Sequence, residues 1–405
     1  YISGTASAIH DPLYARALAM SDGGKTVVMV EMDLIMVNGY MSNEIKQEIE
    51  KRTGIPPQNV TLTAVHTHTG PEGYYEEFGK YPRIVDLKMK MKIEDATVAA
   101  VEAAVKAMIP AEAGSAYIDM TGLAHNRHSG DPIDNRGLLL LVRDAKSRNL
   151  IGGFINFASH GIIAPAEQGM ISADWSEVMN GIIDKKMNGG YFLFLQGAEG
   201  NVTPAGYDGK GWEGVADYGA KVANTVLKQF DKVTEFTSDF PVDGRLEELV
   251  FPVKTSKKLT EFKKSIKEKT EEYKKSSLTP DEQNARIRWM NDRANIEAFI
   301  IPMFKTMKRI KNGETHTWAQ SIRLGDTLLV AFPGEAITEL AFKVREDLAP
   351  KKVVVLSLTN DHLAYLTTQK VFDEGGYEAG MSFVYPDSAM KITEALEKQA
   401  KELEN

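Results

Sequence analysis

Short apolar runs that end in polar side chains recur along the whole chain. Such runs are typical of strands that are buried on both faces of a sheet. Helical patterns lie between them, so we predict an α/β fold (mixed α+β) in which mixed β-sheets are flanked by helices. In sheets of this kind, ligands bind beyond the carboxyl ends of the strands. The runs cover residues 25–33, 59–70, 150–160, 191–196, 326–335 and 352–360.

The second of these runs ends in two histidines. Side chains alternate between the faces of a strand, so a strand over residues 59–70 would place His66 and His68 on one face, at its carboxyl end. Two histidines at this spacing can bind one metal ion, or one can bind the metal while the other works beside it. The alternative is a pair of histidines that only form structural hydrogen bonds.

Most of the other runs also end on residue types that bind metals. Several separate strands that end in this way point to an enzyme built around one metal centre, because the carboxyl ends of such strands collect ligands. These ends carry Asp33, His160 and Glu335, and the last run leads into Asp361, His362 and Tyr365.

Composition limits the partners and the ligands. The net charge is −8, from 48 basic and 56 acidic residues, so the overall charge does not favour a nucleic-acid partner. No apolar run approaches the roughly 20 residues of a membrane span. The chain contains no cysteine, so a zinc site here has to use His, Asp, Glu or Tyr.

A helical hairpin is predicted near residues 257–310. Residues 257–275 are rich in Lys and Glu, and Thr279, Pro280 and Glu282 form a capping box that starts a second helix. We otherwise expect residues 1–405 to form a single catalytic domain. A β-hairpin is expected over residues 13–33, and further helices over residues 42–51, 84–108, 212–230, 335–348 and 388–404.

Three polar segments leave their roles open. Arg127 lies in a loop over residues 125–130, which is either a solvated turn or part of a site. Asp174 is either a helix N-cap or a site residue. The glycines in residues 197–204 would let the backbone approach a ligand.

Many short motifs follow one another in the order found in the neutral/alkaline ceramidase family, and the chain resembles that family over most of its length. They are Asp11-Pro12-Leu13-Tyr14-Ala15-Arg16-Ala17, His66-Thr67-His68-Thr69-Gly70-Pro71, Asn126-Arg127, Ser159-His160-Gly161, Ile171-Ser172-Ala173-Asp174, Phe194-Leu195-Gln196-Gly197, Tyr365-Leu366-Thr367-Thr368 and Tyr377-Glu378-Ala379.

The resemblance implies a zinc-dependent amidase that cleaves the N-acyl bond of ceramide into a fatty acid and a sphingoid base. Zinc bound mainly by neutral histidines makes water nucleophilic near neutral pH, and the oxyanion that forms on the amide needs positive partners. One zinc ion per chain and a small-molecule or lipid substrate are expected. Carried over by motif, the zinc ligands are His66, His160, Glu335 and Tyr365, and His68 and Arg127 hold and polarise the amide.

The chain departs from the family pattern at several places. Asn360-Asp361-His362 replaces a stretch that resembles Asn-Thr-Tyr, so His362 or Asp361 could compete with Tyr365 as a ligand. Asn201 stands where an Asp is common, and we expect no C-terminal β-sandwich domain. Two other functions stay open: a metal-dependent hydrolase of an ester or phosphoester, and a non-catalytic protein that binds a lipid or a sugar.

Overall fold

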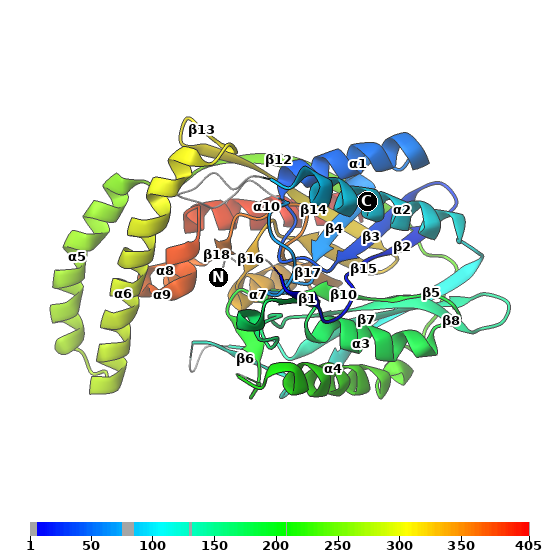
Figure 1. The fold of residues 1–405 in the computed structure, drawn as a ribbon, viewed down its shortest axis with the longest axis horizontal. Coiled ribbons are helices and arrows are strands. Elements are labelled where there is room, and N and C mark those ends of the chain that lie inside the picture. Colours follow the sequence, from blue (N-terminus) through cyan, green and yellow to red (C-terminus); the bar gives the residue numbers. More distant parts are fainter. Residues whose placement is uncertain (1–5, 75–84, 129–131, 208, 405) are drawn as a thin grey trace.

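The computed structural model describes residues 6–74, 85–128, 132–207 and 209–404. It confirms the predicted mixed α/β fold, with mixed sheets flanked by helices (Figure 1). Within the described residues, no helix combines the length and the apolar character needed to cross a bilayer.

Three sheets form the body, and each contains one parallel pair of strands. The first has the order β2 (Ala15–Ser21), β3 (Thr26–Met32), β4 (Val60–Ala64). The second has the order β10 (Phe192–Gln196), β8 (Leu150–Phe157), β7 (Arg136–Asp144), β5 (Ala111–Asp119). The third has the order β12 (Val242–Pro252), β14 (Glu314–Leu324), β15 (Thr327–Ala331), β17 (Lys352–Leu356), with β13 (Ile310–Lys311) also on β14.

The parallel pairs are β3 with β4, β8 with β10 and β15 with β17, and the other pairs in these sheets are antiparallel. The predicted hairpin at residues 13–33 is the β2–β3 pair. One buried apolar cluster joins the three sheets, since it contains Met29 of β3, Phe154 of β8 and Leu329 of β15. The sheets are therefore held against one another by a shared core, which brings the ends of their strands together.

Three short strand pairs lie outside these three sheets. They are β1 (Ala8–Ile9) with β9 (Met170–Ile171), β6 (Ala124–Asn126) with β11 (Val202–Pro204), and β16 (Glu335–Ala336) with β18 (Tyr365–Leu366).

Helices cover the outer faces of the sheets. They are α1 (Gly39–Thr53) and α2 (Leu87–Lys106) beside the first sheet, α3 (Trp175–Ile183) and α4 (Gly211–Leu227) beside the second, and α7 (Thr338–Asp347) and α10 (Pro386–Glu402) beside the third. The expected helices at 42–51, 212–230, 335–348 and 388–404 correspond to α1, α4, α7 and α10. The helix expected from residue 84 begins at Leu87, and Ile84 itself lies outside the described residues.

The predicted helical hairpin is present as α5 (Ser256–Lys274) and α6 (Pro280–Ile300). The capping box at Thr279 and Glu282 is formed as expected. The second helix ends earlier than predicted, because a 3-10 helix with Pro302 in its first turn follows at Ile301–Thr306. In Figure 1, α5 lies outermost at the left, and α6 lies between α5 and the short helices α8 (Gln369–Glu374) and α9 (Gly376–Met381).

Candidate metal centre

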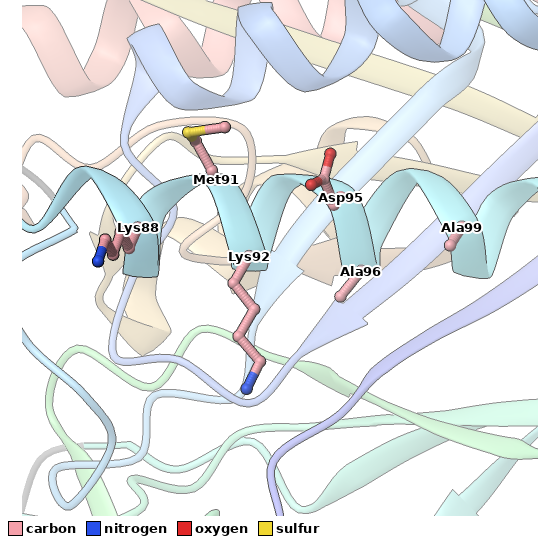
Figure 2. A pocket seen from close by; sticks show the side chains of 6 residues that line it. All are labelled: Lys88, Met91, Lys92, Asp95, Ala96 and Ala99. Atoms are coloured by element: carbon pink, nitrogen blue, oxygen red, sulfur yellow. The ribbon is translucent and has the colours of Figure 1, made fainter.

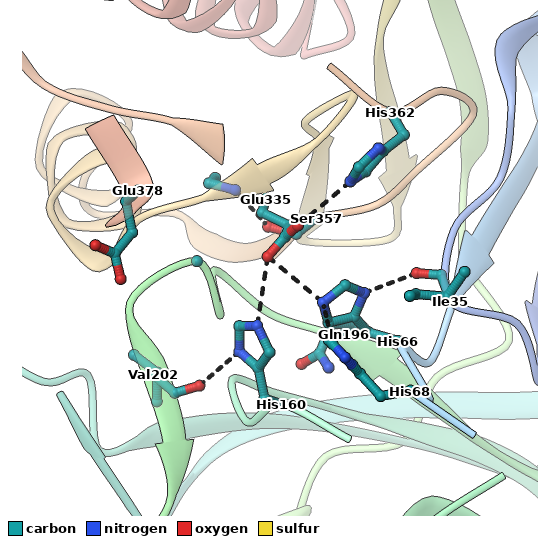
Figure 3. A network of polar contacts seen from close by, with 12 residues as sticks. Ile35, His66, His68, His160, Gln196, Val202, Glu335, Ser357, His362 and Glu378 are labelled. Carbon is teal, nitrogen blue, oxygen red and sulfur yellow. Dashed lines mark hydrogen bonds and ion pairs between the residues drawn. The ribbon is translucent and has the colours of Figure 1, made fainter. Parts of the chain in front are cut away.

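The polar cluster lies where one strand of each parallel pair ends. His66 follows β4, His160 follows β8 and Glu335 follows β15. All three side chains are buried. Figure 3 shows them pointing toward one another. The structure therefore brings these three residues from separate strand ends together.

The explanation for the His66–His68 pair from strand alternation is wrong. Strand β4 ends at Ala64, and His66 adopts a left-handed backbone conformation with φ of 68°. This bend, and not the period of a strand, brings His68 Nε2 to 3.2 Å from His66 Nε2. A residue other than glycine is strained at such a φ, which is common at functional sites.

Hydrogen bonds set the tautomers of the two buried histidines. His66 Nδ1 donates to the carbonyl oxygen of Ile35 at 2.7 Å, and His160 Nδ1 donates to that of Val202 at 2.9 Å (Figure 3). Because a carbonyl can only accept, each imidazole carries its proton on Nδ1 when it is neutral. The Nε2 atom of each ring therefore keeps a lone pair for a metal ion.

Glu335 supplies the third donor. Its Oε2 atom lies 3.4 Å from His66 Nε2 and 3.3 Å from His160 Nε2. Its Oε1 atom lies 3.3 Å from His362 Nε2, so His362 braces the carboxylate from the other side (Figure 3). Burial alone would raise the pKa of Glu335, but the surrounding imidazoles of His66, His160 and His362 hold it well below its usual value.

The donor set fits a tetrahedral zinc ion. His160 Nε2 and Glu335 Oε2 are buried and have no hydrogen-bond partner, which is unusual for buried polar atoms. Zinc bonds of about 2.0–2.1 Å in a tetrahedron require ligand atoms about 3.3–3.4 Å apart. The two distances from Glu335 Oε2 to the histidine nitrogens match that spacing.

Tyr365 lies next to this donor set. The parallel pairing of β16 and β18 makes Glu335 and Tyr365 cross-strand partners. Burial, together with the carboxylate of Glu335, raises the pKa of the Tyr365 phenol well above its usual value. A cation is needed to draw this phenol toward phenolate.

The two alternatives to Tyr365 have other partners. Asp361 forms a buried ion pair with Arg309, with Oδ2 2.6 Å from Nη2, and also accepts hydrogen bonds from Thr317 and from the backbone of Gly39. His362 faces Glu335, as described above. Asp361 is thus part of a structural ion pair, and His362 orients the carboxylate of Glu335.

His68 and Arg127 flank the donors. Burial and the neighbouring histidines lower the pKa of His68 well below its usual value, so the ring is neutral near pH 7. Arg127 Nη2 contacts the carbonyl oxygen of Gly200 and lies 2.9 Å from Glu378 Oε1. The Nε atom of Arg127 is buried without a hydrogen-bond partner, which leaves a donor for a ligand. Arg127 therefore lies at the site and is not part of a solvated turn, although Ser129 and Gly130 of its loop lie outside the described residues.

Other polar residues that the sequence drew attention to have structural roles. Asp33 accepts a hydrogen bond from the Tyr14 backbone and pairs with Arg16. Asp174 is the N-cap of α3, accepting from the Trp175 backbone. Asn201 accepts hydrogen bonds from Thr338 at the start of α7. These three side chains therefore form hydrogen bonds or ion pairs with other residues of the protein.

Sequence reasoning missed Glu199, which is fully buried. Neither of its carboxylate oxygens has a hydrogen-bond partner of normal geometry. The ligand atoms of Glu199, His66 and Glu335 lie within 4.8 Å of one another. The ligand atoms of His66, His68 and His160 also lie within 4.8 Å of one another. Burial, opposed by His66 and reinforced by Glu335, raises the pKa of Glu199 to about 8. The glycines on both sides of Glu199 are a signal that could have led to it.

The hollow on the outer face of α2 is a different kind of feature (Figure 2). It measures about 580 Å³ and is lined by a single face of one helix. None of its lining residues belongs to the predicted site. They are Lys88, Met91, Lys92, Asp95, Ala96 and Ala99.

Comparisons with known proteins agree on one family. The family model described as "Neutral/alkaline non-lysosomal ceramidase, N-terminal" matches residues 2–205. Neutral ceramidase 1 of Arabidopsis thaliana is 28% identical over 191 residues, which are 42% of this chain and 24% of that protein. Neutral ceramidase 2 of the same plant is 27% identical over 189 residues, and 25% of its length is covered. The match thus spans about a quarter of these curated relatives.

Solved structures share the fold. The neutral ceramidase from Pseudomonas aeruginosa superposes with a TM-score of 0.77 at 19% identity, covering 97% of this chain and 69% of that one. A structure titled "Ceramidase complexed with C2" gives the same TM-score at 17% identity and covers 98% of this chain and 70% of the other. The arrangement of sheets around the cluster is therefore one found in solved ceramidases.

Proposed function

Because this chain belongs to the neutral/alkaline non-lysosomal ceramidase family, we propose that it is a zinc-dependent hydrolase that cleaves the N-acyl amide bond of ceramide or of a related N-acyl lipid. We place this activity in residues 1–405 as one catalytic domain with one zinc ion per chain. The observation that carries the proposal is the buried set of His66, His160 and Glu335, whose Nε2 and Oε2 atoms converge.

His66, His160 and Glu335 would hold the zinc ion, with Tyr365 as the fourth ligand. When bound there, zinc supplies a Lewis acid that makes water nucleophilic near neutral pH. The rest of the reaction depends on the side chains around these ligands.

His68 is suited to moving a proton. Its ring is neutral near pH 7 and lies beside His66, so it can take up a proton from the attacking water. The same ring can then donate that proton to the leaving amine, which must be protonated as the amide bond breaks. His68 thereby serves first as a general base and then as a general acid.

Arg127 is suited to stabilising charge on the substrate. The amide oxygen gains negative charge in the transition state, and the unpaired Nε–H of Arg127 is a buried donor with a full positive charge behind it. Glu378 and the carbonyl of Gly200 bind the other end of the guanidinium and so hold it in place. Loss of one such donor costs about 100- to 1,000-fold in turnover in comparable sites.

The test combines metal content with hydrolysis of a short-acyl fluorescent ceramide, before and after chelation. We expect about one zinc ion per chain, in line with one donor set, and cleavage that chelation abolishes and zinc restores. His160→Ala should lose both zinc and activity. His316→Ala is the matched control, because that histidine is exposed and pairs with Glu248 on the surface.

Each other outcome selects a different function. Bound zinc without amide cleavage, but with release of product from an ester or phosphoester, would assign the site to another hydrolase. No bound zinc and no activity after zinc is added would support a lipid- or sugar-binding protein instead.

A further inference from the structure

Glu378 on α9 connects Arg127 to a second buried residue. Its Oε1 atom lies 2.9 Å from Arg127 Nη2, and its Oε2 atom lies 2.8 Å from His128 Nε2. Glu378 and His128 are both buried. Both oxygens of one carboxylate are therefore used to hold adjacent residues of the loop after β6.

Helix α6 reaches this carboxylate through an aromatic contact. The ring of Trp289 packs against that of His128, with centroids 4.9 Å apart. The backbone of α6 also touches the turn before α9. A Cβ atom at Gly375 would lie 2.6 Å from the carbonyl oxygen of Trp289, and one at Gly376 would lie 3.4 Å from the His128 ring. The turn can approach α6 and His128 this closely because both positions are glycine.

Ion pairs and hydrogen bonds attach α6 to α8, which precedes Glu378, and to α9, which carries it. Arg286 pairs with Glu374 of α8 at 2.6 Å, and Arg293 Nη1 donates to the carbonyl of Phe372 at 2.6 Å. On the other side, Lys254 pairs with Glu297 of α6 at 3.0 Å and donates to the carbonyls at the end of α9. Much of this network is buried, so α6, α8 and α9 form one rigid unit.

We propose that Trp289, His128 and Glu378 are positioning residues through which helix α6 sets the orientation of the Arg127 guanidinium. This inference deepens the proposed function, and it rests on Arg127 facing the substrate amide. An arginine side chain has many rotamers, and a misplacement of about 1 Å at a reacting centre can cost about 100-fold in rate. The helical hairpin thus contributes to catalysis indirectly, through Trp289, His128 and Glu378.

The test is a double-mutant cycle with the holoenzyme and a short-acyl fluorescent ceramide. Trp289→Ala and Glu378→Gln should each lower kcat by roughly 10- to 100-fold, with little change in KM or zinc content. In an Arg127→Ala background, the same changes should lower the residual kcat by less than about 2-fold, since they act through Arg127. Trp289→Phe keeps an aromatic ring against His128 and should restore most of the rate.

Phe299→Ala is the control on the same helix, because Phe299 is exposed. It should leave kcat unchanged in both backgrounds. Equal losses from Trp289→Ala with and without Arg127 would overturn the proposal in favour of a general structural role. An unchanged kcat for Trp289→Ala and Glu378→Gln in the wild-type background would overturn it as well.

A second measurement does not depend on the substrate. Phenylglyoxal modifies arginine, and peptide mass spectrometry gives its rate at Arg127. If this relay of Trp289, His128 and Glu378 holds the Arg127 guanidinium, Trp289→Ala and Glu378→Gln should speed modification at Arg127 several-fold, whereas Phe299→Ala should not. Unchanged modification rates would overturn the relay even if the amide proved not to be the substrate. Faster modification without any amide cleavage would instead keep the relay and remove the proposed reaction.

Discussion

At the scale of single residues, the site depends on which atom of each side chain is already used. The carbonyls of Ile35 and Val202 occupy Nδ1 of His66 and His160, and His362 occupies Oε1 of Glu335. The atoms that remain, Nε2 of each histidine and Oε2 of Glu335, converge. Asp361 belongs to a residue type that binds metals, but it pairs with Arg309 and is therefore not available to the metal site.

Asp361→Asn tests this distinction. The change leaves the buried Arg309 without its counter-charge, so we expect the free energy of unfolding to fall by about 3–5 kcal/mol. The zinc content of the folded protein should stay the same. Urea unfolding and metal analysis measure the two quantities, and Asp243→Asn, in a surface pair with Lys25, should cost under about 1 kcal/mol. Zinc loss at unchanged stability would make Asp361 a ligand.

Lys46 on α1 predicts a pH dependence. Burial lowers the pKa of its ammonium from 10.5 to about 7. Between these two pH values the unfolded chain binds the proton and the folded chain does not, so this residue makes stability rise with pH by up to about 1.4 kcal/mol per pH unit. Lys46→Met should flatten the rise in unfolding free energy between pH 7 and pH 9.5. An identical slope in the variant and the wild type would refute this assignment.

At the scale of elements, the site is built from strand ends whose backbones lie within hydrogen-bonding distance of one another. The loop after β10 donates from the Gly200 backbone to the carbonyl of Ala336 in β16 at 2.9 Å. The same glycine accepts from Arg127. One loop therefore sets the separation between the strand that carries Glu335 and the arginine beside it.

Gly200→Ala should disturb both the strand that carries Glu335 and the contact with Arg127. A Cβ atom there would lie 2.8 Å from the carbonyl oxygen of Glu335 and 2.9 Å from that of Ala336, so β16 has to shift. We expect a loss of about 1–3 kcal/mol in stability and weaker zinc binding, measured by thermal unfolding and by competition with a chelating dye. Gly181→Ala is the control, because that helical position has open space and the change should be neutral or stabilising. Equal zinc affinity in the two variants would show that the close approach of Gly200 to β16 does not affect zinc binding.

At the scale of the whole molecule, the three proposed zinc ligands follow strands of three sheets that share one apolar core. His66, His160 and Glu335 are far apart in sequence, so the unfolded chain cannot present them together. Binding of a metal ion to this set is therefore coupled to the folded arrangement of all three sheets.

Zinc should accordingly stabilise the protein. At a free zinc concentration 100 times Kd, the expected gain is about 2.7 kcal/mol, seen as a rise in Tm that depends on zinc concentration. Chelation should reverse the rise, and His160→Ala should show none. A Tm in the wild type that ignores both zinc and chelator would contradict the coupling, whatever the catalytic activity.

Much of the local structure follows from nearby residues. The apolar runs became strands, and Thr279 with Glu282 started α6 as predicted. These features follow from hydrophobic period and from hydrogen bonds between neighbours, which a sequence displays directly. The histidines and Glu335 at strand ends could be identified for the same reason, and the family motifs added Tyr365 and Arg127.

The partner of each polar strand end was decided by tertiary structure. Asp33 pairs with Arg16 and Asp361 with Arg309, while Glu199 lies unpaired beside His66 and Glu335. The bend at His66 that directs its ring has no signal in the local pattern. A buried carboxylate is stabilised by whichever cation or donor the packing of distant sheets places within about 3 Å. Local periodicity carries no information about that distance, so only the folded chain separates ligands from structural ion pairs.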